Sequence, residues 1–557
     1  MPEVKSRIGM THRVGAALPW LWLAGAWAFG VVFMLLYGRS LLDSDMASEM
    51  VLAAQLNREG GFLSSAWYYS TELRVFCQQL LFKLGLWVFP QNWHAARTLA
   101  QAILSALTAA SALYFLYGAS LRKSAPWLAG ILLCPFGFWQ LFHCVFGGFY
   151  FVHMIFVMLS MGLVLRLVRQ TGTTRRKVLR VVLLAALAFA AGLNGVRILM
   201  NLYAPLAAAA LVMLAWRWHA APLRRPRSVP RVRFAAASLW AAVWALAGYA
   251  VNAGTLAGQY TFSDQGQRGW TSLDFSRLLT TWADFLALFG YPGDRGALDY
   301  TDPVPLFSTV GLLGAVGLLI ALVLIAATVQ LVRCRRDLCF EHGAVLAVFL
   351  SCLLVDGMAF AFLNDMIGIN GSYWLPVVPL ALAVLGVAGE NVPLRKGLPR
   401  RGLALGLAAA FVCVSISTTL RFVEEPPRGD PHLETISDWL VENGYTQGYA
   451  TFWYGNVLTE LSDGQLEIWT VDDMTRMNLH EWLQSCEHQN PPQGEVFLLI
   501  DPTVARENLA YGKSAHVVYE DDYGFMILAA PEAEPLVKAS QAAEAARVAQ
   551  NAQNAQK

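Results

Sequence analysis

Residues 37–61 read YGRSLLDSDMASEMVLAAQLNREGG. This stretch begins where the first long apolar run of the chain ends, and three carboxylates, Asp43, Asp45 and Glu49, follow at once. The residues after Asp45 form an amphipathic segment that ends at Gly60, a pattern that predicts a helix. Carboxylates so close to the end of a transmembrane helix place acidic groups at a membrane surface.

The composition is that of a membrane protein. Of the 557 residues, 56% are hydrophobic and 14% are charged, whereas an ordinary soluble domain has about 25% charged residues. The apolar runs stop near residue 420, which predicts a transmembrane domain over 1–421 followed by a water-soluble domain. The net charge is only +2 and the basic residues are bunched in short loops, which argues against a nucleic-acid partner.

The apolar segments predict a polytopic all-α membrane domain, because about twenty apolar residues cross the hydrocarbon core. With the N-terminus inside, the cytoplasmic segments hold 24 of the 41 Lys and Arg, and the outer loops before the soluble domain hold 10. The positive-inside rule therefore predicts an N-in, C-out topology, with the first span as a retained signal anchor. The eleven predicted spans are 14–37, 95–117, 126–143, 150–168, 178–199, 202–219, 233–252, 305–332, 342–363, 372–390 and 402–420.

Two predicted outer loops, 38–94 and 253–304, are too long to be simple connections. Within the first, Arg74 and Lys83 interrupt the apolar pattern of 71–89, so a helix lying in the membrane interface fits better than a twelfth span. The second loop mixes Asp, Trp and Tyr with Gly/Pro turns, a composition suited to covering a polar site.

After Arg421 the pattern changes to that of a soluble α/β domain, which we place at 422–535 on the outer side. The segment HLETISDWLVENGY predicts a helix, GYATFWYG and EVFLLID predict strands, and AHVVYEDDYGFMILA predicts a hairpin. The Ala- and Gln-rich residues 536–557 are predicted to be a loose low-complexity tail.

The pair Asp43 and Asp45 has two interpretations. Acidic residues are favoured at a helix N-terminus, where they cap backbone N–H groups. Alternatively, a carboxylate at this position can act as a general base on a hydroxyl group delivered from outside, or hold a divalent metal ion. The residues alone leave both interpretations open, and no metal or other cofactor is certain.

The layout resembles the GT-C superfamily of polytopic glycosyltransferases, and within it the group of protein O-mannosyltransferases and lipid A aminoarabinose transferases. These proteins place an Asp-Glu pair after the first span, followed by an amphipathic helix that ends in Gly; Asp45 to Gly60 reproduces that spacing. The segment NDMIGINGSYWLPVVPL resembles a late span of the family. One departure is that Met46 occupies the second acidic position, with Asp43 as the nearest other carboxylate.

The resemblance implies an inverting glycosyltransferase of a bacterial cytoplasmic membrane. Such an enzyme moves a sugar from a polyprenyl-phosphate donor to an envelope glycan, lipid or protein acceptor on the outer face. On spacing, Asp45 is the predicted base, and Asp43 is a second carboxylate or metal ligand.

Arg197 and Arg97 lie at the outer ends of predicted spans, where an arginine either snorkels to the interface or binds the phosphate of the donor. We predict the second role, with Arg197 first because Asn194 and Asn201 are close to it in sequence. The predicted acceptor or substrate contacts are Glu72, Trp67, Tyr69, Asn194 and Trp270.

Two other functions are left open. A transporter or flippase of a lipid-linked glycan should have related halves and charges near the middle of the bilayer, of which Asp356 is the clearest here. A non-catalytic partner in envelope assembly is the third alternative.

Overall fold

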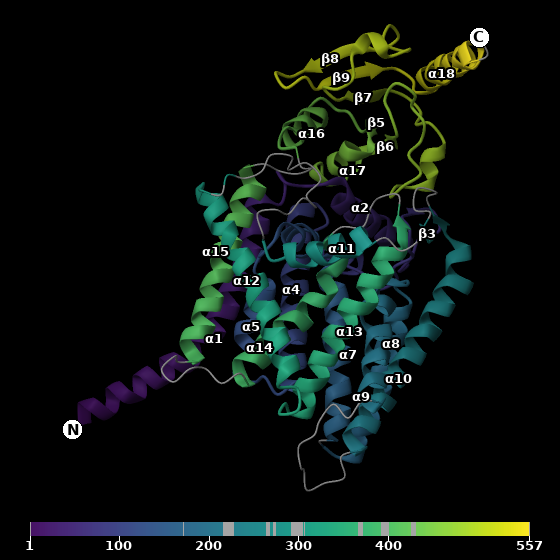
Figure 1. Ribbon diagram of the computed structural model, residues 1–557. Helices are drawn as coiled ribbons and strands as arrows, with labels where there is room; N and C mark the ends of the chain where they lie inside the picture. The colour runs from purple at the N-terminus through teal and green to yellow at the C-terminus, as the bar shows by residue number, and fades with distance from the viewer. Residues whose placement is uncertain are drawn as a thin grey trace.

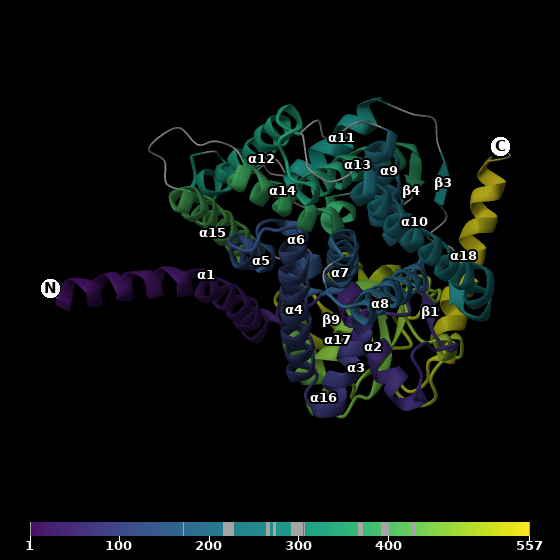
Figure 2. The ribbon, with the colours of Figure 1, turned by 90° about the horizontal axis from the view of Figure 1, so that it is seen from below.

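The protein consists of a helical body covered at one end by an α/β domain (Figure 1). The computed structural model describes residues 2–170, 172–215, 228–262, 268–270, 275–290, 305, 307–365, 371–391, 400–424 and 430–555. The N-terminal part of helix α1 (Pro2–Tyr37) projects away from the body, as Figures 1 and 2 both show. The predicted fold class, a polytopic helical domain followed by an α/β domain, is confirmed at this level.

Among the described residues, eight helices are long and apolar enough to cross a membrane, or nine if a bent pair counts as one span. The bent pair consists of α5 (Ala125–Leu133) and the segment Phe138–Phe146, which contains α6 (Phe138–Gln140) and η1 (Leu141–Phe146). The eight lie in α1, α4 (Trp93–Gly118), α7 (Phe149–Arg169), α10 (Ser228–Val251), α12 (Thr309–Arg333), α13 (Phe340–Phe362), η6 (Gly371–Val377) with α14 (Val378–Asn391), and α15 (Arg400–Glu424).

The described residues therefore contain fewer candidate spans than the eleven predicted. The predicted span 126–143 is bent by 86°, because Pro135 cannot continue the helix. Helix α8 (Thr174–Gly192) has four basic residues in its first two turns, which leave too short an apolar stretch. Helix α9 (Ala204–Ala215), together with η2 (Leu199–Tyr203), falls below the required length within the described residues. The orientation of the termini stays a prediction.

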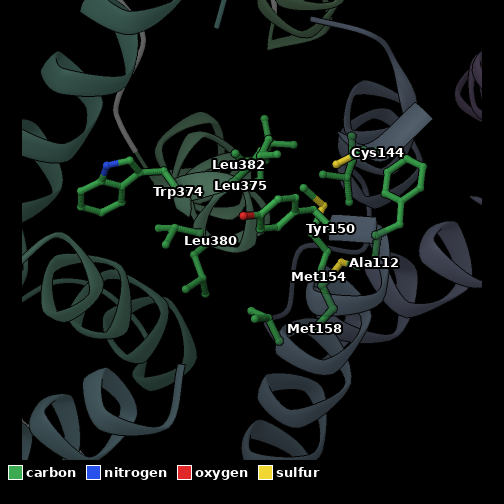
Figure 3. Close-up of a cluster of buried hydrophobic side chains, with 14 of the residues drawn as sticks. Ala112, Cys144, Tyr150, Met154, Met158, Trp374, Leu375, Leu380 and Leu382 are labelled. Atoms are coloured by element: carbon green, nitrogen blue, oxygen red, sulfur yellow. The ribbon is translucent and has the colours of Figure 1, made fainter. Parts of the chain in front are cut away.

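Helix α14 lies in the core of the helical body. Within the candidate span Gly371–Asn391, 89% of the most apolar stretch is buried. Leu380 and Leu382 of α14 lie in one buried cluster with Met154 and Met158 of α7 (Figure 3). A helix that is apolar on all sides, as α14 is, is expected to be buried on all sides.

The first outer loop contains the two predicted amphipathic segments. Helix α2 (Ser44–Glu59) is confirmed, with Asp43 as its N-cap and Gly60 as its C-cap in the left-handed conformation that favours glycine. The second segment forms α3 (Gln79–Val88), whose ten residues are too few to span a bilayer.

The second outer loop begins with η3 (Asn252–Leu256) and η4 (Ala257–Gln259), and it contains α11 (Phe275–Ala287). Its strand β2 (Thr261–Phe262) pairs with β1 (Tyr68–Tyr69), so the two outer loops meet. Strand β3 (Arg268–Trp270) pairs with β4 (Leu363–Asp365). The remaining parts of the predicted loop, 263–267, 271–274 and 291–304, lie outside the described residues.

The C-terminal domain has a mixed five-stranded sheet in the order β6-β5-β7-β9-β8. The predicted hairpin and the predicted helix in HLETISDWLVENGY are confirmed. Residues 534–555, however, form a helix rather than a loose tail, because an Ala-rich sequence has high helix propensity. The elements are α16 (His432–Glu442), β5 (Gln447–Thr451), α17 (Phe452–Leu461), β6 (Glu467–Val471), β7 (Val496–Ile500), β8 (His516–Glu520), β9 (Met526–Ala530) and α18 (Glu534–Ala555).

The C-terminal domain packs directly on the first outer loop, with α17 on the side of the sheet that faces α2 (Figure 1). The Ser44 hydroxyl donates to the backbone carbonyl of Phe452. The backbone N–H of Trp93 donates to Asp463 at 2.6 Å, and Arg39 forms an ion pair with Glu434 at 2.6 Å. The acidic turn at the start of α2 is therefore held between the membrane helices and the C-terminal domain.

Candidate active site

The N-terminus of α2 presents two aspartates in different roles. Asp43 is buried, and its Oδ1 accepts hydrogen bonds from the backbone N–H groups of Asp45 and Met46 at 2.9 and 3.4 Å. Asp45 lies in the first helical turn and is only partly buried. Asp43 therefore caps the helix, which leaves Asp45 as the more accessible carboxylate of the pair.

One turn further along α2, Glu49 adds a third carboxylate. It is buried, and its Oε1 lies 3.6 Å from a guanidinium nitrogen of Arg74. Burial raises the pKa of Glu49 and the negative charge of Asp45 adds to this shift, whereas the positive charge of Arg74 opposes it. The site therefore combines Asp45, which is partly exposed, with Glu49, whose ionised form is disfavoured by burial.

Arg197 lies between α8 and η2, among aromatic rings. Its Nη1 donates to the Tyr150 hydroxyl at 2.6 Å, and its guanidinium carbon lies 4.7 Å from the ring centroid of Tyr373 and 5.7 Å from that of Phe149. Tyr150, at the start of α7, extends toward the segment that carries Leu375 and Leu380 (Figure 3), where its hydroxyl lies 3.4 Å from that of Ser372. Cation–π contacts of this kind orient a guanidinium relative to the rings that surround it.

Phe149 joins the two halves of the site. The guanidinium carbon of Arg74 lies 4.3 Å from the Phe149 ring centroid, and that of Arg197 lies 5.7 Å from it. Glu72 packs against Gly195, where a Cβ would come within 3.2 Å of the Glu72 carboxyl carbon. Gly195 has a φ of +91°, which glycine adopts without strain. The carboxylates of α2 and the predicted phosphate-binding Arg197 thus belong to one polar cluster at the end of the bundle beneath the C-terminal domain.

Arg97 is placed elsewhere, in the contact between α4 and α17. Its Nε and Nη2 donate to the two carboxylate oxygens of Glu460 at 2.5 and 2.6 Å, and Nη2 also donates to the carbonyl of Met46 at 2.9 Å. Arg97 is fully buried. A guanidinium neutralised in this way is poorly suited to bind a phosphate, so we leave Arg97 out of the donor site.

The remaining predicted contact residues differ in position. Asn194 exchanges two hydrogen bonds of 2.7 Å with the backbone of Phe76, so it ties the arginine-bearing segment to the first outer loop. Trp67 and Tyr69 are buried in an apolar cluster between the first outer loop and the C-terminal domain. Trp270 lies in strand β3 of the second outer loop.

Four residues of the cluster were not predicted as site residues from the sequence: Glu49, Arg74, Phe149 and Tyr150. The four-residue spacing between Asp45 and Glu49, which places both on one face of a helix, was an available signal. Arg74 was noted only as an interruption of an apolar pattern, although it lies two residues from Glu72. No signal in the sequence brings Phe149 to these residues, because their contact depends on helix packing.

Among the described residues, no group of three or more His, Cys, Asp or Glu is arranged to hold a metal ion. A role for Asp43 as a metal ligand stays a prediction, and no step below depends on a metal.

Solved structures share this architecture. The crystal structure of ArnT from Cupriavidus metallidurans in the apo state matches with a TM-score of 0.57 at 12% identity, covering 92% of this chain and 98% of that one. The structure of the same protein bound to undecaprenyl phosphate matches with a TM-score of 0.54 at 13% identity, covering 90% of this chain and 97% of that one. The chain has the GT-C glycosyltransferase fold. No family model matches the chain, and no curated protein matches it in sequence.

The predicted resemblance to GT-C glycosyltransferases is thereby confirmed at the level of the fold. The shared fold covers the helical body and the C-terminal domain, since about nine-tenths of the chain is matched. At such low identity the chemistry must be argued from this chain's own residues.

Proposed function

We propose that this protein is a glycosyltransferase that moves a sugar from a polyprenyl-phosphate donor to an acceptor hydroxyl on the outer face of a bacterial cytoplasmic membrane. The observation that carries the proposal is the polar cluster itself: Asp45 and Glu49 lie on α2, and the guanidinium groups of Arg74 and Arg197 both lie near the Phe149 ring. This cluster lies at one end of a fold shared with ArnT, which has been solved with undecaprenyl phosphate bound.

Each part of the cluster has a role in the proposed reaction. Asp45 removes the proton of the acceptor hydroxyl, whose oxygen attacks the anomeric carbon of the donor sugar. The bond between that carbon and the phosphate oxygen breaks, and polyprenyl phosphate leaves with the electron pair. Arg197 and Arg74 stabilise the negative charge that develops on this phosphate. A single displacement of this kind inverts the anomeric configuration.

The assignment of the base to Asp45 rather than Asp43 rests on their surroundings. The Asp43 carboxylate is occupied with two backbone N–H groups of the helix it caps, whereas Asp45 is partly accessible. Glu49, whose pKa is raised by burial, holds Arg74 beside the Phe149 ring. Glu72 and Trp270 remain proposed acceptor contacts, and the acceptor is an envelope glycan, lipid or protein.

The proposal is tested by a turnover assay with the purified full-length protein in lipid nanodiscs. The assay offers a panel of undecaprenyl-phosphate sugars together with membrane-derived acceptors, and it measures release of undecaprenyl phosphate. We expect release with at least one donor by the wild type and a loss of at least about 100-fold in Asp45→Asn. Release in neither protein with any donor, or equal release in both, contradicts the proposal.

The same assay separates the other two functions. A flippase would move the donor across the bilayer without breaking its sugar–phosphate bond, and an assembly partner would do neither.

Topology needs a separate measurement: a reporter that is active only in the cytoplasm, fused after residue 421, should give no signal.

A further inference from the structure

The contact between Arg97 and Glu460 is the most completely buried ion pair of the described chain. The side chains of Arg97 and Glu460 are exposed by only 1% and 5%, respectively. The pair joins α4 of the membrane body to α17 of the C-terminal domain, across 363 residues of sequence. The Arg97 guanidinium also stacks on the ring of Phe82, 4.7 Å away.

Stability alone does not explain such a pair. Removing two charges from water costs free energy that the attraction between them often fails to recover. Two observations show this cost: burial raises the pKa of Glu460 despite the opposing charge of Arg97, and among the described atoms the buried Nη1 of Arg97 has no hydrogen-bond partner. Apolar residues of similar size would fill the same space at lower cost.

The third hydrogen bond of Arg97 shows what the pair can do. Its Nη2 donates to the carbonyl of Met46, the residue that follows the proposed base. One residue before the base, the Ser44 hydroxyl donates to the carbonyl of Phe452, the first residue of α17. The turn that carries Asp45 is thus bonded to α17 on both sides. Ser44 bonds to α17 directly, and Met46 is connected to it through Arg97 and Glu460.

We propose that Arg97 and Glu460 are positioning residues through which the C-terminal domain sets the orientation of the Asp45 turn. This inference rests on the proposed function for its effect on turnover, but not for its effect on the backbone. Because a general base must lie within hydrogen-bond reach of its proton, a small displacement of the turn slows the chemical step while leaving donor binding nearly unchanged.

The test uses the full-length double variant Arg97→Met/Glu460→Leu, which removes both charges and the bond to Met46 while keeping apolar bulk at both positions. We expect kcat to fall roughly 10- to 100-fold, with binding of undecaprenyl phosphate and the unfolding temperature close to those of the wild type. Backbone amides of residues 45–50 should exchange hydrogen faster, because the start of α2 is less restrained.

Two further variants make the result specific. Arg97→Lys keeps a charge partner for Glu460, but one ammonium group cannot reproduce the planar fork that reaches the carboxylate and the Met46 carbonyl together, so we expect an intermediate loss of kcat. The matched control is Arg169→Met/Glu341→Leu, which removes a 2.6 Å ion pair between α7 and α13. Arg169 is the last residue of α7, at the end opposite to Phe149. This control should change neither kcat nor exchange at residues 45–50.

The outcomes distinguish the two proposals. Unchanged kcat and unchanged exchange at residues 45–50 in Arg97→Met/Glu460→Leu overturn the positioning role, as does an equal effect in the Arg169 control. If the wild type turns over no lipid-linked sugar, the proposed function fails, and the exchange measurement alone decides whether the pair positions the turn.

Discussion

The surroundings of Arg97 and Arg197 differ, and the difference bears on which of the two arginines is proposed to bind the donor phosphate. Both residues were predicted from sequence to bind phosphate, because each lies near the outer end of an apolar segment. Arg97 is fully buried, and its guanidinium donates hydrogen bonds to both carboxylate oxygens of Glu460. Arg197 is partly buried, lies against aromatic rings and donates to a phenol. The comparison shows that the position of an arginine along a span does not reveal which groups its guanidinium contacts in the fold.

The largest effect is expected for Arg97→Ala, and it is a loss of protein stability rather than of donor binding. Arg97→Ala leaves the buried Glu460 carboxylate without its partner, which typically costs about 3–5 kcal/mol. We expect a large fall in the thermal unfolding temperature, measured in detergent or nanodiscs. Normal stability with weakened binding of undecaprenyl phosphate would instead place Arg97 at the donor site.

The next largest effect is expected at the proposed base. Asp45→Asn keeps the size of the side chain but cannot take a proton, so we expect kcat to fall at least about 100-fold while the protein stays folded. Asp43→Asn is the matched control: Asn is also a good N-cap, so this variant should retain most activity. The reverse order of the two losses would make Asp43 the base.

Arg197→Ala should weaken donor binding and turnover roughly 10-fold or more, because a charge-assisted bond to phosphate is lost. Arg197→Lys should recover part of this loss, since a lysine keeps the charge without the bidentate geometry. Stability should change less than in Arg97→Ala. Normal binding and turnover in Arg197→Ala would reduce Arg197 to an interfacial anchor.

The smallest effect concerns pH. Burial raises the pKa of Glu49 in the folded protein above its usual value of 4.5. A carboxyl with a raised folded-state pKa contributes stability below the unfolded-state pKa, and this contribution is lost as pH rises through the folded-state pKa. The unfolding temperature of the wild type should therefore fall, relative to that of Glu49→Gln, as pH rises above about 4.5. A constant difference from pH 4 to pH 8 would contradict the shift.

Features that depend on neighbouring residues in sequence were predictable. The helix α2 and its two caps follow from Asp43, Gly60 and the apolar pattern between them. In the C-terminal domain, α16, β7 and the hairpin follow in the same way from local periodicity. The predicted strand GYATFWYG, however, ends at Thr451 and continues as helix α17, and β6 was not predicted. A low-complexity composition also concealed the helix-forming tendency of residues 534–555. The first predicted outer loop, 38–94, contributes Asp45, Glu49 and Arg74 to the polar cluster, whereas Phe149 and Arg197 come from segments that were predicted to be spans or their ends.

Features that depend on packing were not predictable. A hydropathy window cannot detect the 86° bend near Pro135, so it predicted residues 126–143 as one continuous span. The partner of Arg97 lies 363 residues away, and only the docked C-terminal domain reveals it. For the same reason Arg74 was predicted only as an interruption in the apolar pattern of 71–89, whereas in the fold the Phe149 ring lies near both Arg74 and Arg197.

The central claim, that a polyprenyl phosphate binds beside Arg197 and Arg74, is tested most directly by photocrosslinking. A photoreactive undecaprenyl-phosphate analogue, with the reactive group next to the phosphate, is incubated with the full-length protein in nanodiscs, and labelled peptides are mapped with and without excess undecaprenyl phosphate. We predict competed labelling of peptides that contain Arg74, Phe149–Tyr150 or Arg197, and loss of that labelling in Arg197→Ala but not in Arg169→Met/Glu341→Leu. Competed labelling confined to the peptides of Arg97 and Glu460, or labelling that excess undecaprenyl phosphate does not reduce, would contradict the account.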